Sequence, residues 1–213
     1  MVRFGTIIAA DDITIDKDSV YLCELGERSV LGILLKEMEK SKVKEWSVVL
    51  GHDHDLHRRA IEKSPVRCIV DDYWRKGFES QALRGLKEMP PQADGFIILP
   101  GDLPFFTAEI MNEMFSALTD EKGFIIVAGS EDQILPYPLF HRRYFGEVLR
   151  RLEMDAFFEI TKDHPMETYQ VEIPDKNFLH RVTDEASYKK AQEIFFEIDE
   201  GRDLSNPQST IPQ

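Results

Sequence analysis

Short apolar runs alternate with longer amphipathic stretches along most of the chain. Runs rich in Ile, Val and Leu predict buried strands, and they cover Phe4–Ala9, Trp46–Leu50, Val66–Val70, Gly95–Leu99 and Phe124–Val127. Apolar residues at helical spacing predict helices between them, over Ser29–Glu39, Leu56–Lys63, Ser80–Met89, Ala108–Leu118 and Tyr144–Leu152. The pattern therefore predicts an α/β fold with three α/β/α layers and a mostly parallel, Rossmann-like sheet.

The pattern becomes less regular toward the C-terminus. It predicts a short helix over Ala156–Thr161, a strand over Glu167–Ile173 and a last helix over Asp184–Ile198. The final segment, Gly201–Gln213, contains two prolines and almost no apolar residue, which is typical of a flexible tail. Because no linker divides the rest, we expect a single domain over residues 1–200.

Composition narrows the classes of partner. The chain has 213 residues and a formal net charge of −13, which argues against nucleic acids and anionic membranes as partners, because both attract basic surfaces. No apolar run approaches the roughly 18 residues of a membrane helix. Two cysteines, Cys23 and Cys68, do not form a metal or disulfide motif. A reducing cytoplasm is therefore the expected compartment.

The most informative motif is the run from Ile97 to Phe106, in which a buried strand leads directly into Gly101, Asp102 and Pro104. In an open α/β sheet, ligands bind at the carboxyl ends of the strands. A carboxylate at that place suits Mg²⁺, which commonly takes one or two protein carboxylates together with substrate phosphates. The alternative is that Gly-Asp only makes a turn.

A second motif runs from Asp71 to Leu86, where another strand end leads into a helix. Gly77 and Ser80 can shape a helix N-terminus whose free N–H groups attract an anion or a base edge. Gly85 inside that helix costs helix propensity and indicates close packing. The alternative is an ordinary capped surface helix.

Together these motifs resemble the nucleotidyltransferase family of the molybdenum cofactor guanylyl- and cytidylyltransferases. Gly51-His52 matches that family's Gly-His after a strand, and the stretch from Asp71 through Gly77 to Gly85 corresponds to its Asn-x₅-Gly-x₃-Ser-Leu-x₂-Gly pattern, with Asp71 in place of the Asn. Leu99–Pro104 matches Leu-Pro-Gly-Asp-x-Pro, and Pro138–Arg143 is similar to a Pro-Leu-Phe segment before a basic helix start. The resemblance extends over roughly residues 4–195.

The resemblance implies a nucleotide-diphospho-sugar transferase-like fold. It implies Mg²⁺-dependent transfer of a nucleotide from an NTP to a phosphorylated acceptor such as molybdopterin. Asp102 would be the catalytic metal ligand, with Asp184 as the nearest candidate for a second one. The expected nucleotide-binding residues are Ala9, Ala10, Lys17, Asp71, Gly77, Ser80 and Gly101, and the expected acceptor-binding residues are Arg142 and Arg143.

The N-terminal loop departs from the family pattern. After its first strand the family carries a loop with glycines, an Arg and a Lys that wraps the NTP phosphates. Here Asp11–Asp18 contains four aspartates, no glycine and a single cation, Lys17. Carboxylates repel a triphosphate, and backbone N–H groups approach it less closely without glycine. The alternative hypothesis is therefore a non-catalytic relative that binds a ligand or a partner protein without nucleotidyl transfer.

A third hypothesis is a metal-binding protein that uses His52, His54 and His57, three histidines within six residues. Such clustering is compatible with a metal site. The alternative is a polar loop between a strand and a helix, with Asp53 or Asp55 as the helix N-cap.

Overall fold

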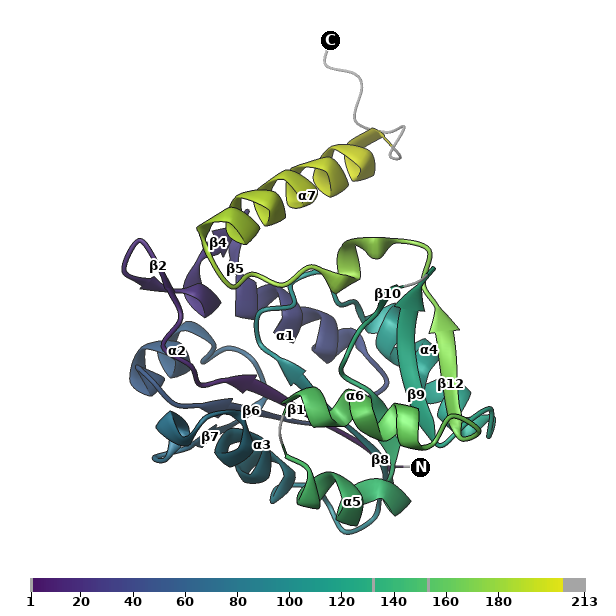
Figure 1. Ribbon diagram of the computed structural model, residues 1–213. Helices are drawn as coiled ribbons and strands as arrows, with labels where there is room; N and C mark the ends of the chain where they lie inside the picture. Colours follow the sequence, from purple (N-terminus) through teal and green to yellow (C-terminus); the bar gives the residue numbers. More distant parts are fainter. Residues whose placement is uncertain (1, 132, 153, 205–213) are drawn as a thin grey trace.

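A mixed sheet with helices on both faces forms the body of the protein in this computed structural model, which describes residues 2–131, 133–152 and 154–204 (Figure 1). The strand order is β10-β9-β11-β8-β1-β6-β7, and β12 pairs with β9. The pairs β1–β6, β1–β8, β6–β7 and β9–β12 are parallel, whereas β11 runs antiparallel between β8 and β9. The predicted three-layer α/β/α fold is therefore confirmed.

The main strands are β1 (Val2–Ala9), β6 (Glu45–Leu50), β7 (Arg67–Val70), β8 (Ala93–Pro100), β9 (Ile125–Ser130), β10 (Gln133–Ile134), β11 (Leu139–His141) and β12 (Thr168–Glu172). Two small hairpins are made by β2 (Thr14–Ile15) with β3 (Asp18–Ser19) and by β4 (Glu24–Leu25) with β5 (Arg28–Ser29). The α-helices are α1 (Val30–Lys40), α2 (His54–Ala60), α3 (Phe78–Leu86), α4 (Ala108–Thr119), α5 (Phe145–Arg150), α6 (Met154–Asp163) and α7 (Glu185–Leu204).

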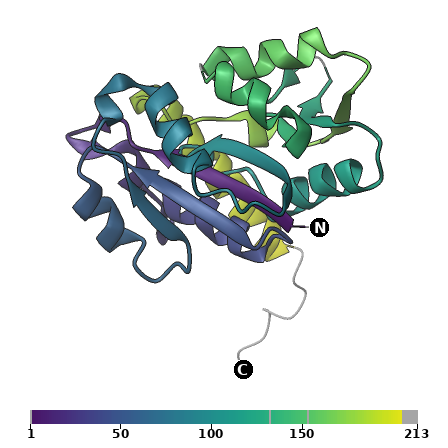
Figure 2. The same ribbon diagram turned by 90° about the horizontal axis from the view of Figure 1, so that it is seen from below.

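Two apolar clusters lie on the two faces of the sheet. One is formed with α1, α4 and α7, and the other with α3, α5 and α6. In the turned view of Figure 2, α5 and α6 (green) lie together at one end of the sheet, and α7 (yellow) lies behind the strands. Helix α1 buries the apolar stripe that the sequence pattern predicts, which consists of Val30, Leu31, Leu34, Leu35 and Met38. Burial of such a stripe is what anchors an amphipathic helix to a sheet.

The predicted elements occur within a few residues of their expected bounds, and the differences lie in short elements. The periodicity gives no signal for the two hairpins or for β10 and β11, because a strand of two or three residues is too short to establish a period. The last helix continues through Leu204, so the tail predicted from residue 201 begins too early. The rest of that predicted tail, residues 205–213, lies outside the described residues.

Candidate functional site

The carboxyl ends of the parallel strands place several of the expected site residues at one edge of the sheet. The N–H of Gly101 donates to Ile8 O at 2.7 Å, and the N–H of His52 donates to Ala10 O at 3.0 Å. Asp71 follows β7 at the same edge. This edge is where an open α/β sheet binds its ligands.

Asp102 lies at this edge, directly beyond the end of β8, but its carboxylate is already occupied. Arg181 Nε donates to Asp102 Oδ1 at 2.8 Å, and Arg181 Nη2 donates to Oδ2 at 2.7 Å. The N–H of Val182 also donates to the backbone oxygen of Asp102 at 3.0 Å. Asp102 is only 1% exposed, so the segment around Arg181 covers it.

Tyr21 is buried near Asp11 and Asp102, which follow the ends of β1 and β8. Its side chain is 2% exposed. The pKa of Tyr21 lies well above its usual value because of burial first, and then because of the negative charges of Asp11 and Asp102. A neutral phenol therefore fills the place where the sequence comparison expects a phosphate-binding loop.

The expected phosphate loop is a β-hairpin. Thr14 pairs with Ser19 and Ile15 with Asp18, so the backbone of this segment is bonded to itself. Lys17 occupies the exposed turn with a positive φ of 78°. A hairpin of this kind offers a triphosphate no cradle of N–H groups.

Buried polar groups continue along the edge toward β7. Gln81 Nε2 donates to Asp11 Oδ1 at 2.8 Å and to Trp74 O at 3.2 Å. Asp71 is 3% exposed, and its Oδ1 accepts the N–H of Tyr73 at 3.0 Å. No described protein group hydrogen-bonds to Asp71 Oδ2 or Gln81 Oε1.

A cavity of about 430 Å³ lies beside Asp71, lined also by Tyr73, Lys76, Ser80 and Arg84. Gly77 precedes it with a φ of 84°, and a Cβ at that position would meet nothing within 4 Å. The backbone conformation, not a close contact, is what this glycine supplies to the start of α3. Asp71 and Ser80 thus line one cavity, while Gly77 shapes the helix start next to them.

Asp184, the other expected metal ligand, caps α7. Its Oδ1 accepts the N–H of Ser187 at 2.8 Å and the hydroxyl of Ser187 at 2.8 Å. These hydrogen bonds from Ser187 hold the pKa of Asp184 below its usual value. The carboxylate satisfies a helix N-terminus, which is a common structural role of Asp.

The residues present do not fit a Mg²⁺ ion. Arg181 takes both carboxylate oxygens of Asp102, Asp184 is engaged at the helix cap, and a guanidinium beside a divalent ion repels it. Across residues 2–131, 133–152 and 154–204, no group of three or more His, Cys, Asp or Glu side chains could hold a metal ion. The expected pairing of Asp102 and Asp184 around a metal is therefore not what the structure contains.

The three histidines diverge instead of forming a metal site. His57 is fully buried, and its Nε2 lies 2.7 Å from Ser19 Oγ. His52 packs against Trp74 with ring centroids 5.2 Å apart, and His54 begins α2. Burial lowers the pKa of His57, which keeps the ring neutral.

Arg142 and Arg143, the expected acceptor-binding residues, lie at the opposite end of the sheet from Asp102. Because β11 is antiparallel to β8, with His141 opposite Gly95, the chain leaves β11 at the amino end of β8. Arg142 Nη1 donates to Pro90 O at 3.3 Å and to Ala93 O at 3.2 Å.

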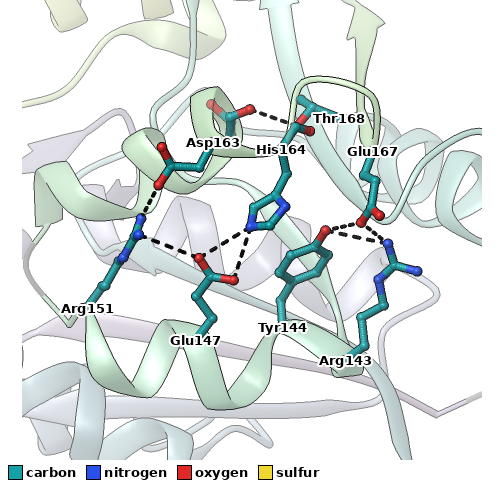
Figure 3. Close-up of polar contacts among 9 residues, drawn as sticks. Arg143, Tyr144, Glu147, Arg151, Asp163, His164, Glu167 and Thr168 are labelled. Atoms are coloured by element: carbon teal, nitrogen blue, oxygen red, sulfur yellow. Dashed lines mark hydrogen bonds and ion pairs between the residues drawn. The ribbon is translucent and has the colours of Figure 1, made fainter.

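Arg143 belongs to a polar network over α5, α6 and β12 (Figure 3). It pairs with Glu167, which also accepts the hydroxyl of Tyr144. In the same network, His164 lies 3.1 Å from Glu147. Carboxylates therefore neutralise the cation that sequence reasoning assigned to an acceptor phosphate.

Sequence reasoning missed Arg181, Tyr21 and Gln81. The only available signal for Arg181 is that a late segment of the family, rich in acidic residues, reads here as Arg181-Val182-Thr183-Asp184. Tyr21 carries no signal, because an isolated aromatic residue after a polar loop is typical of a core position.

The fold is that of nucleotidyltransferase-type α/β proteins. Rv0371c of Mycobacterium tuberculosis superposes with a TM-score of 0.78 at 18% identity, over 90% of this chain and 97% of that one. A nucleotidyl transferase from Methanothermobacter thermautotroptrophicus gives 0.77 at 16% identity, over 92% and 99%. Molybdopterin-guanine dinucleotide biosynthesis protein A from Archaeoglobus fulgidus gives 0.63 at 13% identity, over 91% and 99%.

The chain belongs to the family of the MobA-like NTP transferase domain, whose model matches residues 20–165. This match confirms the resemblance inferred from Leu99–Pro104. It includes Tyr21 and Asp102, whereas the hairpin of β2 and β3 and Arg181 lie outside it. A search of curated proteins by sequence finds no match. One solved structure of Rv0371c is a complex with manganese.

None of the helices described in this chain is long and apolar enough to cross a membrane.

Proposed function

We propose that this protein binds a nucleotide-sized ligand at the carboxyl edge of the sheet and does not transfer a nucleotide. The observation that carries this proposal is the buried, neutral phenol of Tyr21 beside Asp11 and Asp102 at the strand ends. Transfer from an NTP requires N–H groups and cations around the phosphates. Here a buried phenol lies beside Asp11, and the adjoining hairpin carries aspartates.

The ligand we favour is a nucleotide bound beside Asp71. The cavity there, about 430 Å³, falls in the usual size range for small ligands. Asp71 Oδ2 is buried without a described partner, so it would accept an N–H or a ribose hydroxyl. Lys76 and Lys87 also line this cavity and would attract a phosphate, despite the net charge of −13.

Mg²⁺-dependent transfer to a phosphorylated acceptor such as molybdopterin is the second candidate. Family membership and the place of Asp102 at the end of a central strand favour it. It requires Asp102 to leave Arg181 and Tyr21 to leave the strand ends. For either function we propose the cytoplasm as the compartment, supported by two cysteines without a disulfide.

Calorimetric titration with ATP, GTP, CTP and UTP, in millimolar Mg²⁺ and again in EDTA, separates the two candidates. We expect at most weak binding, equal in both buffers and reduced at least tenfold by Asp71→Asn. Asp120→Asn is the matched control, because Asp120 is exposed at the end of α4 and does not line this cavity. Micromolar, Mg²⁺-dependent affinity for one NTP, with pyrophosphate release on addition of an acceptor, would instead establish the transferase.

A further inference from the structure

The carboxylate at the end of β8 pairs with a cation that comes from far along the chain. Arg181 is separated from Asp102 by 79 residues, and its two donor nitrogens lie 2.8 and 2.7 Å from the two carboxylate oxygens. Paired N–H donors of this kind match a carboxylate in both distance and direction. A second cation would have to share an oxygen that already accepts a hydrogen bond from the guanidinium.

The pair is buried on one side only. Asp102 is 1% exposed, whereas 31% of the Arg181 side chain is exposed. Tyr137 lies under the guanidinium, with its ring centre 5.8 Å away. Arg181 therefore separates Asp102 from solvent, while part of its own side chain stays exposed.

The charge on Arg181 is permanent. Burial by itself would lower the pKa of this guanidinium, but the hydrogen bonds and negative charge of Asp102 outweigh burial and raise it. An arginine in such a pair stays protonated at every physiological pH. A bound divalent ion, by contrast, exchanges with solvent and is removed by chelators.

We propose that Arg181 takes the place of a divalent cation at Asp102, so that an anionic ligand binds at this edge without Mg²⁺ or Mn²⁺. This inference rests on the proposed function only in assuming that the ligand carries a phosphate. The ion pair supplies one fixed positive charge where a metal would supply two. Mn²⁺ bound at Asp102 would have to displace the guanidinium and then tolerate its charge nearby.

Mn²⁺ titration followed by electron paramagnetic resonance tests the inference without any nucleotide. The acidic surface will bind some Mn²⁺, so the quantity to compare is the Asp102-dependent part. We expect wild type and Asp102→Asn to bind Mn²⁺ equally. We expect Arg181→Asn to gain a Mn²⁺ site that binds at least tenfold more tightly than the sites of wild type. The double variant Asp102→Asn/Arg181→Asn should lack this site, and Arg181→Lys should not gain it.

Extra Mn²⁺ bound by wild type over Asp102→Asn would overturn the inference, and so would an Arg181→Asn protein that folds but gains no Asp102-dependent site. If Arg181→Asn does not fold, the comparison of wild type with Asp102→Asn still tests the inference. Asp102→Asn should fold, because the Arg181 that it leaves unpaired is partly solvated.

Calorimetry with inorganic pyrophosphate tests the consequence for ligands. We expect the same Kd in EDTA and in millimolar Mg²⁺, weakened at least tenfold by Arg181→Gln. Binding that requires Mg²⁺ would overturn the inference. Absence of binding in both buffers would refute the phosphate assignment, and therefore the proposed ligand, while the Mn²⁺ result still decides whether Arg181 replaces the metal.

Discussion

At the scale of single residues, the pair Arg181–Asp102 has two partners of very different burial. Removing the arginine leaves a carboxylate that is 1% exposed without its partner. Removing the carboxylate leaves a guanidinium that water still reaches. A buried charge without a partner typically costs about 3–5 kcal/mol. A hydrogen bond to a charged group contributes roughly 1.5–3 kcal/mol.

We predict that Arg181→Ala lowers the free energy of unfolding by about 3–5 kcal/mol, and that Asp102→Asn lowers it by less, about 1.5–3 kcal/mol. Urea unfolding monitored by circular dichroism measures both. Arg151→Ala is the control, because its ion pair with Asp163 is exposed and exposed pairs contribute little to stability. Equal losses for Arg181→Ala and Arg151→Ala would contradict the buried pair.

His57 makes stability depend on pH. Burial holds its pKa below the ordinary value of 6.5, and its Nδ1 has no described hydrogen-bond partner. The unfolded chain therefore binds this proton more readily than the folded protein does. The stabilisation from a neutral His57 is complete above the unfolded-state pKa and is lost as the pH falls toward the folded-state pKa.

We predict that the free energy of unfolding falls between pH 7 and pH 5.5. In His57→Gln this fall should be shallower, and the difference in slope is at most about 1.4 kcal/mol per pH unit. Other titrating groups cancel in the difference between wild type and variant. His141→Gln is the comparison, since its pKa is also lowered, by burial and by Arg143, but the side chain is less buried. An unchanged slope in His57→Gln would show that this ring does not titrate differently on folding.

At the scale of elements, helix α3 packs closely against strand β1 because Gly85 has no side chain. A Cβ at Gly85 would lie 2.3 Å from Thr6 Oγ1 and 3.0 Å from its other side-chain carbons. Thr6 is fully buried and accepts the hydroxyl of Ser47 at 2.9 Å, so it has little room to move. The glycine that costs helix propensity in the sequence is explained by this close approach.

We predict that Gly85→Ala destabilises the protein by about 1–3 kcal/mol through overpacking, although alanine is the better helix former. Gly146→Ala in α5 is the matched control. A Cβ there meets only Arg150 at 3.7 Å, so the change should stabilise by roughly 0.5–1 kcal/mol. Thermal unfolding of both variants measures the difference. Stabilisation of the protein by Gly85→Ala would mean that α3 does not contact Thr6 this closely.

At the scale of the whole molecule, the sheet separates two groups of polar residues that the sequence suggests belong together. Parallel pairing of β8, β1, β6 and β7 gathers Ala10, Asp71 and Asp102 at one edge. The reversed direction of β11 takes Arg142 and Arg143 to the opposite edge, into a network with Glu167. Strand direction, not proximity in sequence, decides which side chains share a site.

The sequence by itself determined the layers and the strand ends. Apolar periodicity is a local property, so each strand and helix of ordinary length follows from its own residues, and Asp102 follows as the residue after a buried strand. The motif of Leu99–Pro104 was enough to indicate the family.

Only the tertiary structure decided what surrounds Asp102. Its partner Arg181 lies 79 residues away, and Tyr21 reaches the site only because the hairpin before it folds back on itself. Such contacts depend on where separate segments meet in space, and no local pattern encodes them. For the same reason, the motif around an aspartate at a strand end does not reveal whether the carboxylate binds a metal or pairs with an arginine from a distant segment.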